Sequence, residues 1–285
     1  YVLALTVALN QFDTLFEGFD ALTDKMAALQ KCVAILVQME NFYQPMGGLL
    51  GYHETVLQLL SNPTALPSKD QYLPPPFQDM RTKTSQLWKT CYEGVREFPR
   101  TAYIFPIGGA SDRLNLIDEE TKEQLPAASL LFLGRSLFEH LVRDVEAQSY
   151  WHYSTFGKQI ICPIVLMTSS DKKNDQRIVA MGEQGQWFGH RSDAFFRMVQ
   201  PQVLLVDFEG KWVSDGPLNL VLKPGGHGVI WKLAQDSGAF RWLRERRVDT
   251  AVVRQINNPL ASLDDSFFTL VGYGLKHNKS FGFAS

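Results

Sequence analysis

Two glycine pairs are the residues of this 285-residue chain most able to bring a ligand close to the backbone. Gly108-Gly109 and Gly225-Gly226 each follow a run that reads as a buried strand. A residue without Cβ lets the backbone approach a base or a phosphate, and open α/β sheets bind ligands where parallel strands end. One such pair is an ordinary tight turn. Two pairs at strand-to-helix junctions predict a nucleotide-binding site.

The elements that must position these turns begin at residue 101, where short apolar runs start to alternate with helical stretches. Such alternation indicates right-handed βαβ units and a mainly parallel sheet with helices on both faces, so the predicted fold class is α/β. A turn at Glu209-Gly210 predicts one local hairpin. The pattern predicts strands at 102–107, 160–167, 203–207 and 250–256, and helices at 137–147, 172–183 and 229–246.

The first hundred residues read as a separate helical unit. Apolar residues spaced three and four apart predict one buried helical stripe, formed by Phe12, Leu15, Phe19, Leu22, Met26, Leu29, Val33 and Leu36. A coiled-coil dimer would use the same spacing. Pro45 and Gly47-Gly48 break the helix, however, and the apolar segment 49–60 can fold back, which favours an intramolecular helical hairpin.

Domain boundaries follow from the same pattern. The proline-rich stretch 62–76 reads as a linker, and a further helix at 77–98 leads into the sheet. We therefore predict an all-helical N-terminal domain at residues 1–98 and an α/β nucleotide-binding domain at residues 99–285.

Composition argues against several other classes of protein. A net charge of −2 gives no reason to expect nucleic-acid binding, and the longest apolar run, near residues 2–9, is far shorter than the roughly 20 residues that span a bilayer. The three cysteines, Cys32, Cys91 and Cys162, form no CxxC pair. Buried thiols in a reducing compartment are therefore expected.

The sequence motifs around the glycine pairs resemble those of the UDP-sugar pyrophosphorylases. From Tyr103 the chain reads YIFPIGGASDRL, then a Leu-Pro turn, then GRSLFEHL; MTSS, a lone Gln200, KPGGHG and RQINNP follow in the order that the family uses. Within the family, IFPIGGA and VLKPGGHGVIWKLA are most similar to the plastid UDP-glucose pyrophosphorylases of plants and algae associated with sulfolipid synthesis. The resemblance covers residues 101–285 well and the helical segment less sharply.

This resemblance implies a Rossmann-like, GT-A-like nucleotidyltransferase fold and a transfer reaction. A sugar 1-phosphate, glucose 1-phosphate in the first place, would attack the α-phosphorus of UTP in line and give a UDP-sugar and pyrophosphate. Such a transfer needs placement and positive charge more than covalent help, and Mg²⁺ is expected with UTP. The resemblance also implies the chloroplast stroma as the location.

Site residues are carried over from the same motifs. Arg113 would stabilise the departing pyrophosphate through its planar donor fork, while Met167 and Gln200 would meet the uracil. The glycines would lie against the nucleoside and its phosphates, with His227 beside the phosphates. The nucleotide-binding set implied by the resemblance is Gly108, Gly109, Met167, Gln200, Lys223, Gly225, Gly226, His227 and Asn257.

Two departures from the family pattern concern charge. Ala127 follows Leu125-Pro126 where many sugar nucleotidyltransferases have a lysine; Lys223 can supply some of that charge. Asn257 stands where an aspartate usually helps to hold the metal ion, and an amide is a poorer ligand for a hard cation. Either another carboxylate serves, with Asp112 and Asp207 as candidates, or UTP itself holds most of the metal.

The departures keep a second reading open, a uridine-nucleotide-binding or regulatory protein without turnover. A glycosyltransferase that consumes a UDP-sugar is a third, but the Asp-x-Asp motif usual in such enzymes does not stand at a strand end, and Asp264-Asp265 is not that pattern. The sequence also reads as a fragment. We expect the sugar-binding half to lie beyond residue 285, so that this part alone is incomplete for catalysis, and any transit peptide to be missing from it.

Overall fold

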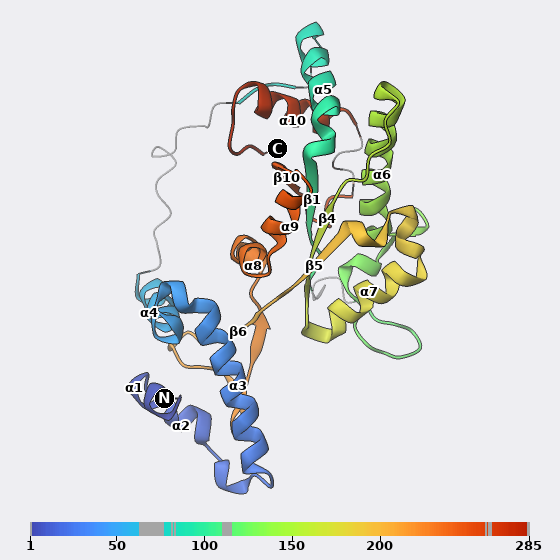
Figure 1. The fold of residues 1–285 in the computed structure, drawn as a ribbon. Helices are drawn as coiled ribbons and strands as arrows, with labels where there is room; N and C mark the ends of the chain where they lie inside the picture. The colour runs from blue at the N-terminus through green and yellow to red at the C-terminus, as the bar shows by residue number, and fades with distance from the viewer. Residues whose placement is uncertain are drawn as a thin grey trace. The chain divides into compact units, whose positions relative to one another are not determined.

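The computed structural model describes residues 2–62, 77–80, 82, 84–109, 116–259, 261 and 264–283. The chain forms two compact units, one of Tyr1–Pro75 with Pro201–Gly225 and one of Pro76–Gln200 with Gly226–Ser285 (Figure 1). This division differs from the boundary at residue 98 that the sequence suggested. The helix before the sheet belongs to the second unit, and the segment after Gln200 returns to the first.

The second unit is built on four parallel strands in the order β10-β1-β4-β5. Their bounds are Thr101–Pro106 for β1, Ile164–Ser169 for β4, Phe195–Gln200 for β5 and Thr250–Val253 for β10. In register, Pro106 lies beside Met167, and Ser169 lies beside Gln200. All four strands therefore end at one edge of the sheet, as the predicted α/β class requires. Strand β5 was not among the predicted strands.

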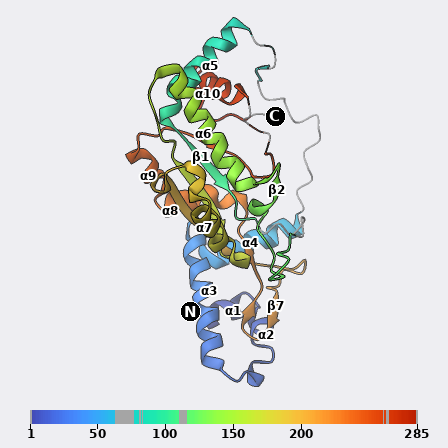
Figure 2. The same cartoon turned by 90° about the vertical axis from the view of Figure 1, so that its right-hand side faces the viewer.

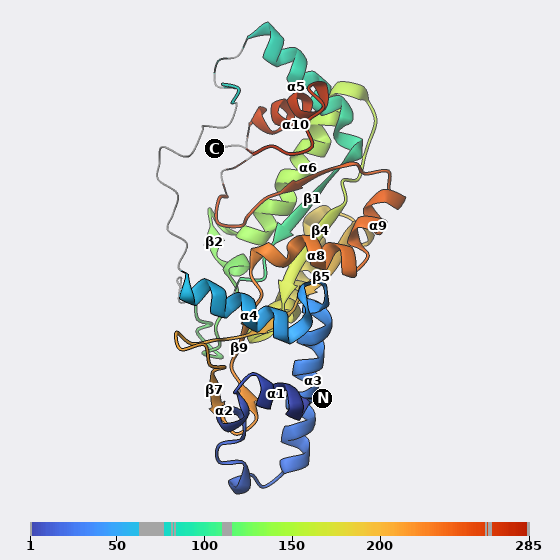
Figure 3. The same cartoon turned by 90° about the vertical axis from the view of Figure 1, so that its left-hand side faces the viewer.

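Helices cover both faces of this sheet, which explains why β1 and β4 are buried along their whole length. Tyr103 and Phe105 belong to a core shared with residues of α6 (Leu137–Phe156) and α7 (Asn174–Gln184). Figure 2 shows these two helices beside the sheet. Ala102 and Ile104 belong to a second core, shared with residues of α8 (Ile230–Asp236) and α9 (Ala239–Glu245). Figure 3 shows α8 and α9 beside the sheet.

Two of these helical regions differ in length from the sequence prediction. Helix α6 begins at its N-cap Ser136, whose side chain accepts from the Glu139 N–H, and it continues well past residue 147. The single helix expected at 229–246 is instead two helices, because Gly238 between them has φ of +83°. Before α6, the short strands β2 (Leu131–Phe132) and β3 (Arg135–Ser136) pair antiparallel.

Helix α5 (Ser85–Glu97) packs against α10 (Ser266–Lys276), a helix that sequence patterning did not predict. A Cβ added at Gly94 would lie 1.9 Å from the Phe268 carbonyl oxygen, and one at Gly272 would lie 2.0 Å from that of Thr90. The two backbones can approach this closely only because both positions are glycine. This packing places α5 in the second unit.

The first unit contains α1 (Val2–Ala8), α2 (Phe12–Phe16), α3 (Lys25–Tyr43) and α4 (Gly48–Ser61). Helices α3 and α4 are in contact, and Gly47, with φ of +97°, lies at the turn between them, so the predicted helical hairpin is confirmed. The prediction of one continuous buried stripe from residue 12 was wrong at its start, because α3 begins only after its N-cap Asp24. Met26, in the first turn of α3, is 64% exposed. The buried side of α3 consists of Cys32, Leu36 and Met39.

Two antiparallel strand pairs complete the first unit. Strand β6 (Gln202–Leu204) pairs with β9 (Leu222–Pro224), and β7 (Ser214–Gly216) pairs with β8 (Asn219–Leu220). The run 203–207 is therefore not part of the parallel sheet, which corrects the sequence prediction, whereas the hairpin turn at Glu209-Gly210 is confirmed by the Val206–Trp212 bridge. Leu204 and Trp212 share one core with Leu15 and Leu36, so this unit is not all-helical.

Two further sequence predictions concern the chain as a whole. Cys32, Cys91 and Cys162 are all buried free thiols, as predicted. Among the described residues, no helix is both long enough and apolar enough to cross a membrane. The predicted linker at 62–76 lies, apart from residue 62, outside the described residues.

Candidate functional site

The first glycine pair lies directly after β1, at the edge where the parallel strands end. The Ile107 N–H donates to the Met167 carbonyl oxygen at 2.9 Å and so keeps this segment beside β4. A Cβ at Gly108 would lie 2.7 Å from the Thr168 carbonyl carbon, whereas a Cβ at Gly109 would meet no atom of the described residues within 4 Å. Packing therefore requires glycine at 108, and the space over Gly109 is open to a ligand.

Gln200, the last residue of β5, joins the two glycine turns. Its Nε2 donates to the Gly108 carbonyl oxygen at 3.3 Å, and its Oε1 accepts from the Gly226 N–H at 3.1 Å. The side chain is buried, with 4% of its surface exposed. An amide has two N–H groups and an oxygen with two lone pairs, so one donor and one acceptor position remain after these two bonds.

The second glycine turn lies where the chain passes from one unit to the other. Gly226 has φ of +79°, a conformation that favours glycine, and His227 after it is exposed at the start of a 3₁₀ turn leading to α8. Gly225 and Lys223 belong to the first unit. Strand β9 before this turn is antiparallel to β6, so the turn does not follow a strand of the parallel sheet as expected.

Asn174 supports the first glycine turn, a role that sequence reasoning missed. Its Oδ1 accepts from the Ser169 N–H at 3.0 Å, its Nδ2 donates to the Ile107 carbonyl oxygen at 3.2 Å, and its side chain is buried. The next residue, Asp175, accepts from the Thr168 hydroxyl at 2.6 Å. Asn and Asp at a helix start are a recognisable signal, but the distant carbonyl that Asn174 binds leaves no trace in the local sequence.

Met167 and Asn257, two other residues of the predicted set, differ in exposure. The Met167 side chain is buried in the core between the sheet and α8, so it presents no surface at the sheet edge. Asn257 is exposed, in a turn that follows β10.

That turn is anchored by Arg254 rather than by Asn257. Arg254 Nη1 lies 2.6 Å from Asp144 Oδ2 of α6, and its Nη2 donates to the Pro259 carbonyl oxygen at 3.1 Å. Burial raises the pKa of Asp144, and the guanidinium of Arg254 offsets part of this rise. A buried pair of this kind fixes the geometry of the segment that carries Asn257, since either charge left alone would be costly.

Of the two metal-ligand candidates and the proposed catalytic arginine, the structure describes only Asp207. Arg113 and Asp112 lie outside the described residues. The Asp207 carboxylate accepts from the Glu209 and Lys211 N–H groups at 2.9 and 2.8 Å, and thus closes the hairpin of the first unit. Across the described part of the chain, three or more His, Cys, Asp or Glu residues nowhere gather as a metal site would require.

Positive charge is present near Leu125-Pro126 despite Ala127. Lys173 Nζ lies 2.8 Å from Glu123 Oε1, and Arg177 also pairs with Glu123. Lys172 Nζ donates to Gln124 Oε1 at 2.6 Å. Two lysines just before α7 and one arginine in its first turns therefore hold the segment that runs into the Leu-Pro turn.

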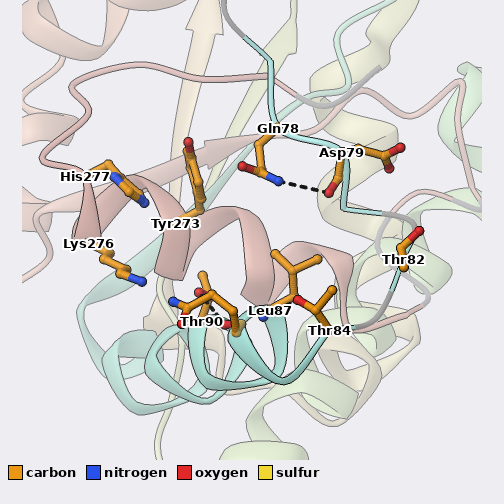
Figure 4. Close-up of a pocket in the computed structure, with 10 residues that line it drawn as sticks. Gln78, Asp79, Thr82, Thr84, Leu87, Thr90, Tyr273, Lys276 and His277 are labelled. Atoms are coloured by element: carbon orange, nitrogen blue, oxygen red, sulfur yellow. Dashed lines mark hydrogen bonds between the residues drawn. The ribbon is translucent and has the colours of Figure 1, made fainter.

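Two surface hollows of the second unit lie away from these turns. One, of about 520 Å³, is lined by the start of α5 and the end of α10, with Thr84, Leu87, Tyr273 and Lys276 around it (Figure 4). The other is lined by several arginines and lies where strands β1 and β10 begin. No residue of the two glycine turns lines either hollow.

Comparison with known proteins gives matches in both sequence and structure, although no protein-family model matches the chain. The chain is 36% identical over 305 aligned positions to a protein of Arabidopsis thaliana named UTP–glucose-1-phosphate uridylyltransferase 3, chloroplastic. This match covers 99% of the chain and 34% of the relative, so the chain spans about a third of that protein's length.

Solved structures share the fold. The UDP-N-acetylglucosamine pyrophosphorylase of Trypanosoma brucei superimposes with a TM-score of 0.69 at 16% identity, covering 97% of this chain and 54% of that one. The UDP-glucose pyrophosphorylase of Leishmania major gives 0.57 at 18% identity, covering 88% and 48%.

A parallel sheet with helices on both faces and a glycine turn after β1 places the chain among the α/β proteins, a class in which ligands bind where the parallel strands end. The sequence match over 99% of the chain narrows the class: the chain is similar to a UTP–glucose-1-phosphate uridylyltransferase, and it shares the fold of UDP-sugar pyrophosphorylases.

Proposed function

We propose that this chain carries the uridine-nucleotide site of a UTP–glucose-1-phosphate uridylyltransferase. In the proposed reaction, a phosphate oxygen of glucose 1-phosphate attacks the α-phosphorus of UTP, the bond to the β-phosphate breaks, and UDP-glucose and pyrophosphate result. The observation that carries the proposal is the Gln200 amide, which holds Gly108 and Gly226 together at the carboxyl edge of the sheet. The name of the Arabidopsis relative supports this substrate pair.

The described residues suit placement of a nucleotide more than covalent chemistry. The open space over Gly109 lets a base or phosphate reach the backbone, and the remaining hydrogen-bonding positions of Gln200 match the paired donor and acceptor on the edge of uracil. Arg113 is proposed to stabilise the departing pyrophosphate, and the cations at the beginning of α7 add positive charge nearby. Met167 contributes by packing rather than by contact.

We propose that Mg²⁺ enters with UTP and that the phosphates hold most of it, since the described residues offer no carboxylate cluster. Asn257→Asp should lower the Mg²⁺ concentration needed for half-maximal UTP binding, because a carboxylate is a better ligand for a hard cation. Without Mg²⁺ the same change should weaken binding, because like charges about 4–6 Å apart repel. Calorimetric titration of UTP under both conditions measures this; an identical effect in both would place Asn257 away from the metal.

We propose a location in the plastid stroma, because the name of the Arabidopsis relative includes the word chloroplastic. We also propose a role in supplying UDP-glucose for sulfolipid synthesis, because the sequence resembles the sulfolipid-associated branch. Import of the full-length protein into isolated chloroplasts would test the location. Recovery of the protein only outside the organelles would refute it.

The direct test of the reaction is pyrophosphate release from UTP with a panel of sugar 1-phosphates. We expect release with glucose 1-phosphate and little with CTP in place of UTP. The second candidate, a nucleotide-binding protein without turnover, is favoured by Ala127 and Asn257. It would be supported if UTP binds in calorimetry while no sugar 1-phosphate gives release, even when the longer protein is assayed.

A further inference from the structure

An arginine-rich hollow lies at the opposite edge of the parallel sheet from the glycine turns. It measures about 740 Å³ and is lined chiefly by Arg100, Arg244, Arg246, Arg247, Val248 and Asp249. Arg100 directly precedes β1 and Asp249 directly precedes β10, so the hollow lies where the strands begin. Six residues of β1, or about 20 Å, separate it from the edge where the strands end.

Two of the four arginines that line the hollow, Arg100 and Arg246, have side chains held by contacts with neighbouring residues. Arg100 pairs with Asp249, whose N–H in turn donates to the Arg100 carbonyl oxygen at 3.1 Å. The Arg246 guanidinium lies 4.0 Å from the ring centroid of Trp242, and its Nη1 donates to the Trp242 carbonyl oxygen at 3.3 Å. Arg244 and Arg247 are exposed, and neither forms an ion pair with a carboxylate of the described chain.

The backbone at Arg247 is unusual for this residue type. The Arg247 N–H donates to the Arg244 carbonyl oxygen at 2.9 Å and the Val248 N–H to that of Leu243 at 3.1 Å, which is the hydrogen-bond pattern that ends many helices. The residue at the centre of this pattern is left-handed and is usually glycine; here it is Arg247, with φ of +60°. A helix dipole favours cations near its carboxyl end, but it does not account for an arginine in this conformation or for Arg100 from another segment.

We propose that this hollow binds a small, multiply charged phosphate anion. The guanidinium groups of Arg244 and Arg247 supply planar donor forks that match phosphate oxygens two at a time, and Val248 gives the hollow a buried apolar floor. Its volume is in the range of small-ligand sites. The site is independent of the proposed uridylyltransferase reaction and would hold its anion far from the glycine turns.

Arginine-selective modification with phenylglyoxal, read by peptide mass spectrometry, tests this site on the whole 285-residue chain. Inorganic pyrophosphate is the probe, at matched ionic strength. At about ten times its Kd, pyrophosphate should slow modification of Arg244 and Arg247 roughly tenfold, because little of the site then stays free. Arg241, exposed on the same helix but outside the hollow, is the control and should react at an unchanged rate.

Variants separate this site from the nucleotide site. Protection of Arg244 and Arg247 should persist in Gly109→Val, whereas the double variant Arg244→Gln, Arg247→Gln should lose the protection of Arg246. Equal protection of Arg241, or none at Arg244 and Arg247, would overturn the proposal. Phosphatidylglycerol vesicles serve as a second probe: protection by vesicles but not by pyrophosphate would also overturn it in favour of a membrane surface.

Discussion

At the scale of single residues, the Gln200 amide has two possible roles, to hold the glycine turns together and to recognise the base, and an experiment can separate them. Gln200→Ala leaves the buried Gly108 carbonyl and the Gly226 N–H without this partner, at about 1–3 kcal/mol for an unsatisfied buried group. UTP affinity should therefore fall by about tenfold or more. Calorimetric titration of UTP and of CTP measures both effects.

The ratio of the two affinities decides whether Gln200 also reads the base. If it does, its loss should narrow the preference for UTP over CTP. If both affinities fall by the same factor, Gln200 only holds the glycine turns, and base selection lies elsewhere. Gln200→Glu is an informative companion, because a carboxylate keeps the acceptor for Gly226 but cannot donate to Gly108.

His53 gives the first unit a dependence on pH. Burial lowers the pKa of His53, and its Nδ1 accepts from the Trp212 indole N–H at 3.3 Å, which only the neutral ring can do. The folded state therefore holds this proton less tightly than the unfolded state does, so the stabilisation is complete above the unfolded pKa of about 6.5 and is lost as pH falls below it.

Urea unfolding midpoints between pH 7.5 and pH 5 should fall as the pH is lowered, and His53→Gln, which keeps an acceptor but does not titrate, should reduce this fall. His277→Gln is the matched control because His277 is exposed. The same pH dependence in the wild type and in His53→Gln would show that other groups control acid stability.

Sequence reasoning at this scale succeeded where a residue type is tied to a backbone requirement. Gly108 and Gly226 could be selected because close approach and positive φ both demand glycine. It could not show that the hydrogen bonds of Asn174 reach Ile107, since its partner lies 67 positions away. Asp207 had the right chemistry for a metal ligand, but its oxygen is used by the turn that it closes.

At the scale of elements, the α5–α10 contact depends on two glycines. Gly94→Ala or Gly272→Ala would drive a methyl group into the facing backbone, which is 1.9 or 2.0 Å from the added carbon. Overpacking of this kind costs about 1–3 kcal/mol, so the free energy of unfolding should fall by that amount. Chemical denaturation of the second unit measures it.

Gly274 on the same helix is the control, because a Cβ there would meet no atom of the described chain within 4 Å. Gly274→Ala should leave the free energy of unfolding unchanged or raise it slightly, since alanine favours helix over glycine. Equal destabilisation by Gly272→Ala and Gly274→Ala would indicate that helix propensity, and not the backbone contact, determines the result.

Periodicity predicted the elements with a strong local pattern and missed those defined by tertiary pairing. Strands β1 and β10 and the α6 and α7 helices lie where apolar runs and helical spacing indicated. Strand β5 was missed because Phe195, Phe196 and Arg197 do not form a wholly apolar run, and it is its pairing with β4 that makes the segment a strand. Residues 203–207 have strand-like composition, but the partner of β6 is β9.

At the scale of the whole molecule, the sequence showed the resemblance to known proteins but did not show that the chain returns to the first unit after Gln200. The change from helical spacing to strand runs suggested a boundary near residue 98. Residues 201–225 return to the first unit, where the backbone N–H of Trp212 donates to Gln11 Oε1 at 2.9 Å. These two residues are 201 positions apart in the sequence. No local pattern reports a contact of that range.

The most direct test of a uridine nucleotide at the carboxyl edge is UTP titration of Gly109→Val beside the wild type. Among the described residues, no atom lies within 4 Å of the added Cβ, so the unfolding midpoint should stay the same while the approach to the turn is filled. We predict that the Kd for UTP rises by about tenfold or more. An unchanged Kd in a folded Gly109→Val protein would contradict nucleotide binding at this turn.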